Sequence, residues 1–144
     1  MNIENVIAGF LRVAAEDLQG ARALAEISNR NAIYLCSQAA EKLIRAVLTA
    51  EGVHAGIGHQ LDRMVESIPN ENPVKQMLKD IQGLGIYATA YRYPTTVGRI
   101  KPAPDYDKFK QFADKVDLAL QEVIKRFDLD IDSTDPAGNA DPIR

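Results

Sequence analysis

Residues 36–48 read CSQAAEKLIRAVL, and this stretch organises the rest of the chain. Its apolar residues fall at positions 36, 40, 43, 44, 47 and 48, which is the spacing of one buried stripe on an α-helix. The polar residues between them are Gln38, Glu41, Lys42 and Arg45. We therefore predict a helix over residues 32–51 that buries one face, presents Lys42 and Arg45 on another, and ends at Gly52, a residue type favoured just past a helix end.

The same helical spacing recurs along the chain. It predicts three further long helices and one short one, over residues 2–28, 59–68 (the short one), 72–92 and 105–127. Gly83 and Gly85 weaken the third of these locally, and Pro94 stops it. No alternating strand pattern persists, so the predicted fold is all-α: an up-and-down bundle of four long helices plus one short helix.

Composition bounds the kind of protein. A chain of 144 residues with 46% hydrophobic content fits one globular domain. Cys36 is the single cysteine, so an intramolecular disulfide and a cysteine-based zinc site are excluded. No apolar run reaches the roughly 18 residues of a membrane-spanning helix. The first residues carry acids and lack the basic start of a signal peptide, so we expect a cytoplasmic protein with no membrane contact.

Charge is distributed unevenly over the chain. The formal net charge is −3, but the residues after Phe127 hold five aspartates against Arg144, a net of −4, which leaves about +1 for the rest. We predict a helical body over residues 1–127 and an acidic, mobile tail over residues 128–144. The body is not basic enough for its net charge alone to indicate nucleic-acid binding, although a local basic patch is compatible with it.

Four short strings then occur in a recognisable order. They are AEDL at residues 15–18, QAAEK at 38–42, HQL at 59–61 and RYP at 92–94. Together they resemble the HEPN family, and in particular stand-alone prokaryotic members of its Arg-Tyr-Pro branch. The resemblance covers about residues 4–127.

The resemblance implies a helical bundle that forms a homodimer. Many HEPN members are metal-independent endoribonucleases, often toxins of toxin–antitoxin pairs, in which an Arg is followed four to six residues later by a His. Other members bind RNA or nucleotides without cutting them, and several act beside a minimal nucleotidyltransferase. Arg92 matches the Arg position here, but residues 93–100 contain no His, and His54 and His59 precede the Arg.

Three functional hypotheses follow. The first is binding of RNA or a nucleotide phosphate in a dimer cleft, beside a minimal nucleotidyltransferase partner in a toxin–antitoxin-like system. The second is a metal-independent endoribonuclease toxin in which Arg92 stabilises charge on the phosphate and His59 moves the proton. The third is a non-catalytic helical adaptor. The sequence shows no P-loop, no GxGxxG motif and no metal-ligand cluster, so we predict neither cofactor nor metal.

The candidate binding residues each have a structural alternative. Arg92 either contacts phosphate or pairs with a helix dipole or a carboxylate. Arg99 and Lys101 either join it in a basic rim or belong to a solvated loop. Tyr93 either stacks on a base, with Tyr87 and Tyr91, or anchors a helix end. Lys42 and Arg45 either line a groove for an anion or form a solvated helix face. The predicted RNA- or nucleotide-binding residues are thus Arg92, Lys42, Arg45, Tyr93 and Arg99.

Overall fold

The protein is built entirely from helices in the part of the chain that the structure describes. This structure is a computed structural model, which describes residues 2–54, 60–89 and 91–128. The elements are α1 (Ile3–Glu26), α2 (Asn31–Glu51), α3 (Leu61–Glu66), α4 (Lys75–Lys79), the 3₁₀ helix η1 (Gln82–Ala88) and α5 (Tyr106–Phe127). The predicted all-α bundle is confirmed. The predicted acidic tail, beyond Asp128, lies outside the described residues.

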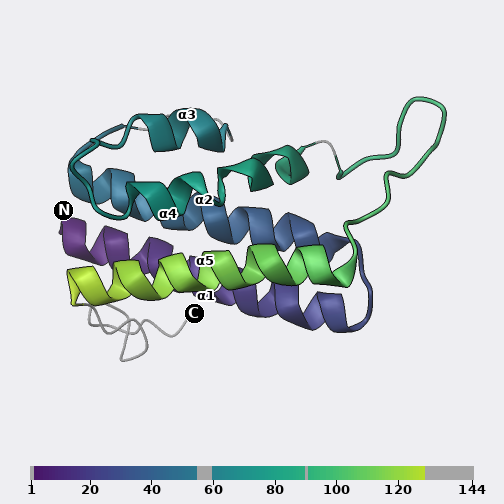
Figure 1. Ribbon diagram of the computed structural model, residues 1–144, viewed down its shortest axis with the longest axis horizontal. Coiled ribbons are helices and arrows are strands. Elements are labelled where there is room, and N and C mark those ends of the chain that lie inside the picture. Colours follow the sequence, from purple (N-terminus) through teal and green to yellow (C-terminus); the bar gives the residue numbers. More distant parts are fainter. Residues whose placement is uncertain (1, 55–59, 90, 129–144) are drawn as a thin grey trace.

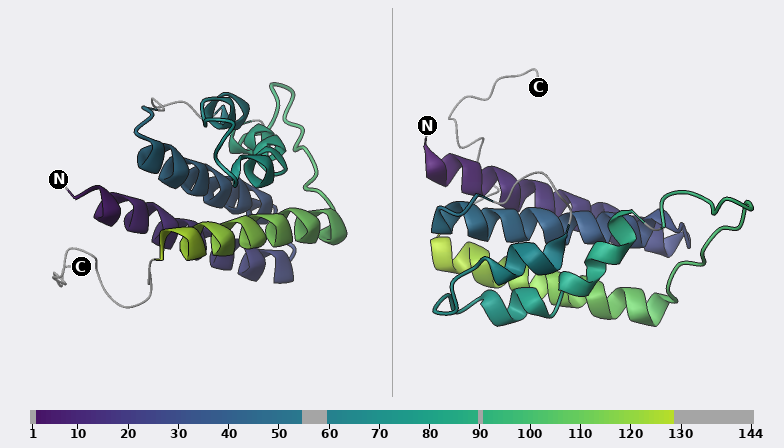
Figure 2. Two further views of the ribbon diagram at one scale, coloured as in Figure 1. Left: turned by 60° about the vertical axis from the view of Figure 1, so that its left-hand side comes forward. Right: turned by 90° about the horizontal axis from the view of Figure 1, so that it is seen from above.

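Three long helices form the body of the bundle. α1 and α2 make an antiparallel hairpin, and α5 lies along both of them, antiparallel to α1 (Figure 1). α3, α4 and η1 form a second, shorter layer on the side of α2 away from α1 (Figure 2). Because α2 contacts α1 and α5 in the body and α3 and η1 in the second layer, it is the element on which the others assemble.

The buried stripe predicted for α2 is confirmed residue by residue. All six of its apolar positions, from Cys36 to Leu48, are at most 1% exposed. Gly52 ends the helix in the left-handed conformation, with a φ of 72° that a residue without a Cβ adopts at no steric cost. α1 approaches this helix closely at Gly20, where an added Cβ atom would lie 3.1 Å from Leu35 Cδ1.

The long helix predicted over residues 72–92 is not continuous in the structure. Residues 72–92 instead form α4, which ends at Lys79, and η1, which begins at Gln82 and ends at Ala88. Gly83 and Gly85 each lower α-helix stability by about 1 kcal/mol relative to Ala. The chain therefore passes this stretch with tighter i to i+3 hydrogen bonds, such as Leu84 N to Ile81 O at 3.1 Å.

A buried lysine fixes the turn between α3 and α4. Lys75 is 8% exposed, and its ammonium donates hydrogen bonds to the carbonyl oxygens of Glu66 and Ile68 and to Asn70 Oδ1. The three acceptors satisfy all three N–H groups of the ammonium. This side chain closes the C-terminal end of α3, which would otherwise leave carbonyl groups unpaired.

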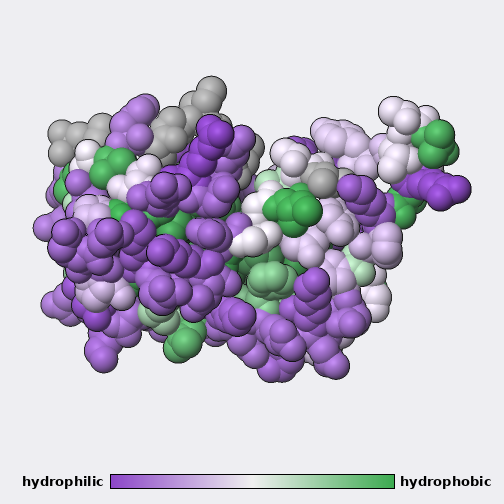
Figure 3. All heavy atoms as spheres, turned by 45° about the horizontal axis from the view of Figure 1, so that its top comes forward, coloured by the Kyte–Doolittle hydropathy of each residue, from purple (hydrophilic) through white to green (hydrophobic). Residues whose placement is uncertain are grey.

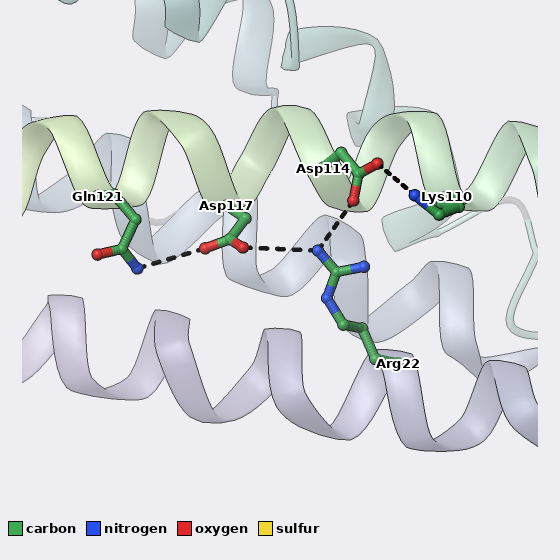
Figure 4. A network of polar contacts seen from close by, with 5 residues as sticks. All are labelled: Arg22, Lys110, Asp114, Asp117 and Gln121. Atoms are coloured by element: carbon green, nitrogen blue, oxygen red, sulfur yellow. Dashed lines mark hydrogen bonds and ion pairs between the residues drawn. The ribbon is translucent and has the colours of Figure 1, made fainter.

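An ion-pair network joins α1 to α5 at the surface (Figure 4). Arg22 Nη2 lies 3.1 Å from Asp114 Oδ1 and 3.6 Å from Asp117 Oδ2, and Lys110 Nζ lies 2.8 Å from Asp114 Oδ2. Hydrogen bonds from Lys110 and Arg22 hold the pKa of Asp114 below its usual value. Exposed pairs of this kind add little stability individually, and here they link the exposed sides of α1 and α5.

No helix in the described ranges is both long enough and apolar enough to cross a membrane.

Candidate nucleic-acid interface

Between η1 and α5 the chain leaves the bundle as a projecting arm, residues 93–104 (Figure 1). Its tip is a hydrogen-bonded turn: Thr95 N donates to Arg99 O at 2.7 Å and Gly98 N donates to Thr95 O at 2.8 Å. Gly98 has a φ of 80°, which suits glycine. At the base, Arg30 Nη2 donates to the carbonyl of Lys101 at 3.0 Å, which ties the arm to the turn between α1 and α2.

Arg92 lies where the arm begins, with its guanidinium near two aromatic rings. Its Cζ is 5.1 Å from the ring centroid of Tyr34 on α2 and 5.4 Å from that of Tyr93. Contacts with aromatic faces favour a cation and hold the planar guanidinium in place. Arg92 and Tyr93 are both exposed, Tyr93 by 67%, so a cation and a stacking surface are displayed together.

A second cation and ring pair lies beside the first. Lys101 Nζ is 5.7 Å from the ring centroid of Tyr91. Tyr91 in turn packs at 4.6 Å from the ring of Tyr87, which is 6% exposed and makes an edge contact with Phe112. Burial raises the pKa of Tyr87. Tyr87 therefore anchors the core, Tyr91 contacts both Tyr87 and Lys101, and Tyr93 is exposed to solvent.

The cations of this region have no acidic partner among the described residues. Within residues 2–54, 60–89 and 91–128, no carboxylate lies within ion-pair distance of Arg92, Arg99 or Lys101. The sequence explains this, because residues 81–104 contain three cations and no acid, which leaves a net of −6 on the remainder. The arm is therefore a positive, aromatic segment of a chain that is otherwise acidic.

Lys42 and Arg45 lie elsewhere and are engaged by carboxylates. Lys42 Nζ is 3.7 Å from Asp17 Oδ2 on α1, and Arg45 Nε is 3.0 Å from Glu41 Oε2. Burial raises the pKa of Asp17, against the opposing effect of Lys42. Lys42 is two helical turns beyond Tyr34, about 12 Å along α2. The structure thus places Arg92 and Tyr93 in contact where the arm begins and Arg99 in the turn at its tip, whereas Lys42 and Arg45 pair with carboxylates of α1 and α2.

Of the two histidines, only His54 lies among the described residues, and it does not join this surface. His59 lies outside the described residues. His54 follows the far end of α2, so nearly the whole helix, about 25 Å, separates it from Tyr34 and Arg92. Across the described ranges, no group of three or more His, Cys, Asp or Glu side chains is arranged to hold a metal ion.

Comparison with known families agrees with this architecture. A family model described as HEPN domain matches residues 7–125, from α1 almost to the end of α5. The chain belongs to the HEPN family. No curated protein and no solved structure matches it. Membership places the chain among HEPN domains, which have RNA-related or nucleotide-binding functions and often dimerise.

Sequence reasoning missed two residues of this HEPN surface. Tyr34 is far from Arg92 in sequence and reaches it only because η1 packs on α2. Arg30, the residue before α2, anchors the arm by donating to the Lys101 carbonyl. One signal was readable in advance: the acid-free run of residues 81–104 marks the basic surface without any knowledge of the fold.

Proposed function

We propose that this HEPN domain binds RNA or a nucleotide phosphate at the surface formed by Arg92, Tyr93, Arg99 and Lys101, which we term the arm site. The observation that carries the proposal is the exposed Arg92 guanidinium between the Tyr34 and Tyr93 rings, without an acidic partner in the described structure. An anion entering this surface displaces no internal ion pair there.

The chemistry of the arm site fits both parts of a nucleotide. The guanidinium fork of Arg92 donates two parallel hydrogen bonds to phosphate oxygens. The ring of Tyr93 offers a face to an unstacked base, and such stacking tolerates any base. Arg99 and Lys101 extend the positive charge along the arm, which suits a strand with successive phosphates.

Lys42 and Arg45 are not included in the arm site. Transferring either to a phosphate would break the pair of Arg45 with Glu41, which is 5% exposed, or the pair of Lys42 with the partly buried Asp17. Such a loss of pairing at a buried carboxylate is unfavourable.

The proposal includes a homodimer and a protein partner. Family membership supports the homodimer, and we propose a minimal nucleotidyltransferase as the partner in a cytoplasmic, toxin–antitoxin-like system. The endoribonuclease and adaptor hypotheses give different outcomes in the test below: the first predicts RNA cleavage in EDTA, and the second predicts no RNA binding.

The test is fluorescence anisotropy with labelled single-stranded RNA in EDTA, followed by a gel of the same RNA. Wild type should bind and leave the RNA intact. Arg92→Ala should weaken binding by roughly tenfold or more, as expected for the loss of a charge-assisted hydrogen bond. The control is Arg126→Ala, an exposed Arg whose partner is Glu122 on its own helix. Equal binding by the two variants would contradict the proposed site, and the absence of RNA and nucleotide binding by wild type would contradict the function.

A further inference from the structure

The arm carries a second feature, distinct from its cations. Val97, within the turn at the tip, is 77% exposed, and Ile100, just after the turn, is 64% exposed. Large apolar side chains on a projecting turn have no body surface beneath them. The turn's internal hydrogen bonds already hold its shape, so little ordering is required when it meets a partner.

A complementary hollow lies between α3 and η1. Its cavity volume is about 600 Å³, and its lining includes Leu61, Asp62, Gln82, Gly83, Gly85 and Ile86. Ile86 is 56% exposed, and a Cβ added at Gly83 would meet nothing within 4 Å. Apolar atoms are visible on this face of the molecule between the helical layer and the arm (Figure 3). We term this site the α3–η1 hollow.

The arm and the hollow are related in a way that suits a second copy of the chain. Both lie on the side of the bundle that carries α3 and η1, and the arm extends away from its own hollow (Figures 1 and 2). A two-fold contact needs a donor and an acceptor surface on one face, because each protomer presents the same patch to the other.

Charge favours the same occupant. Residues 81–104 carry +3, whereas residues 1–80 and 105–127 together carry −2, so a basic arm from one protomer meets a mildly acidic body on the other. Asp62 lines the hollow, and Arg99 lies beside the apolar tip. We propose that, in the homodimer, the tip residues Val97 and Ile100 of each protomer insert into the partner's α3–η1 hollow against Ile86. This inference rests on the proposed homodimer and specifies its contact.

The test is the oligomeric state by light scattering at micromolar concentration. Wild type should be a dimer, and Val97→Asp and Ile86→Asp should each be monomeric with unchanged helicity by circular dichroism. Leu118→Asp is the control, because Leu118 is 64% exposed on α5, apart from the arm and the hollow. A dimeric Val97→Asp variant would overturn the proposed contact and leave the homodimer standing, whereas a monomeric wild type would overturn both.

A further experiment guards against misfolded variants. Val97→Cys protein mixed with Ile86→Cys protein should form an intermolecular disulfide, and neither should do so alone. Absence of the mixed disulfide would reject the contact. RNA binding is measured separately, so failure of the arm site and failure of this contact are distinguishable.

Discussion

The salt dependence of RNA binding tests the arm site most directly. Arg92, Arg99 and Lys101 are exposed and have no acidic partner in the described structure, so each is available to one phosphate. Arg30 is not counted, because its guanidinium donates to the carbonyl of Lys101. Each phosphate neutralised on a single strand contributes about −0.7 to the slope of log K against log[salt].

Three contacts therefore predict a slope of about −2.1, which corresponds to an approximately 18-fold loss of affinity between about 50 and 200 mM salt. Removing one contact with Arg92→Ala should reduce the slope to about −1.4 and the loss to roughly sevenfold. The Arg126→Ala control should keep the wild-type slope, since Arg126 lies in the last turn of α5.

The assay is fluorescence anisotropy with a labelled single-stranded RNA, titrated at several salt concentrations for wild type and both variants. A slope unchanged by Arg92→Ala would show that Arg92 does not contact phosphate. A wild-type slope near zero would refute electrostatic binding at the arm altogether, because counterion release accompanies every phosphate contact.

Three predictions concern the body of the protein. Lys75→Met should lower the free energy of unfolding by about 1–3 kcal/mol, because it leaves buried carbonyl acceptors unpaired. Lys79→Met, on the exposed side of α4, should leave the free energy of unfolding unchanged, and urea denaturation compares the two variants. Gly9→Ala should stabilise α1 by about 0.5–1 kcal/mol because nothing lies within 4 Å of the added Cβ, whereas Gly20→Val should destabilise by about 1–3 kcal/mol; the opposite order in thermal melts would contradict the described packing. Burial raises the pKa of Cys36 to about 12, so the folded state favours the neutral thiol. The contribution of the buried thiol to stability is therefore lost only as the pH rises from the pKa of the unfolded thiol towards the folded pKa of about 12. At pH 8 a thiol reagent should therefore label Cys36 only after unfolding, and rapid labelling of native protein would contradict its burial.

Sequence periodicity was sufficient for the long helices. The apolar positions of residues 36–48 define one stripe, and all of them are buried in α2. The residues of 72–92 also keep an apolar period, but the stripe says nothing about backbone hydrogen bonding. Gly83 and Gly85 disfavour an α-helix in this stretch, and the 3₁₀ helix η1 forms in place of a continuous α-helix.

The candidate site was only partly predictable. Arg92, Tyr93 and Arg99 are close in sequence, so local reasoning placed them together. The partners of Lys42 and Arg92 come from other elements, Asp17 on α1 and Tyr34 on α2. Whether a surface cation is engaged by a carboxylate or displayed beside an aromatic ring depends on these long-range contacts, which no periodicity encodes.

The attachment of the arm has an evolutionary consequence. The arm joins the bundle at η1 and α5, and Arg30 fastens its base, while the tip residues contribute nothing to the buried core. Substitutions between Thr95 and Ile100 are therefore largely decoupled from folding. Selection can retune what this end of the protein recognises while the helical scaffold stays unchanged, so diversification among relatives should concentrate in this short segment.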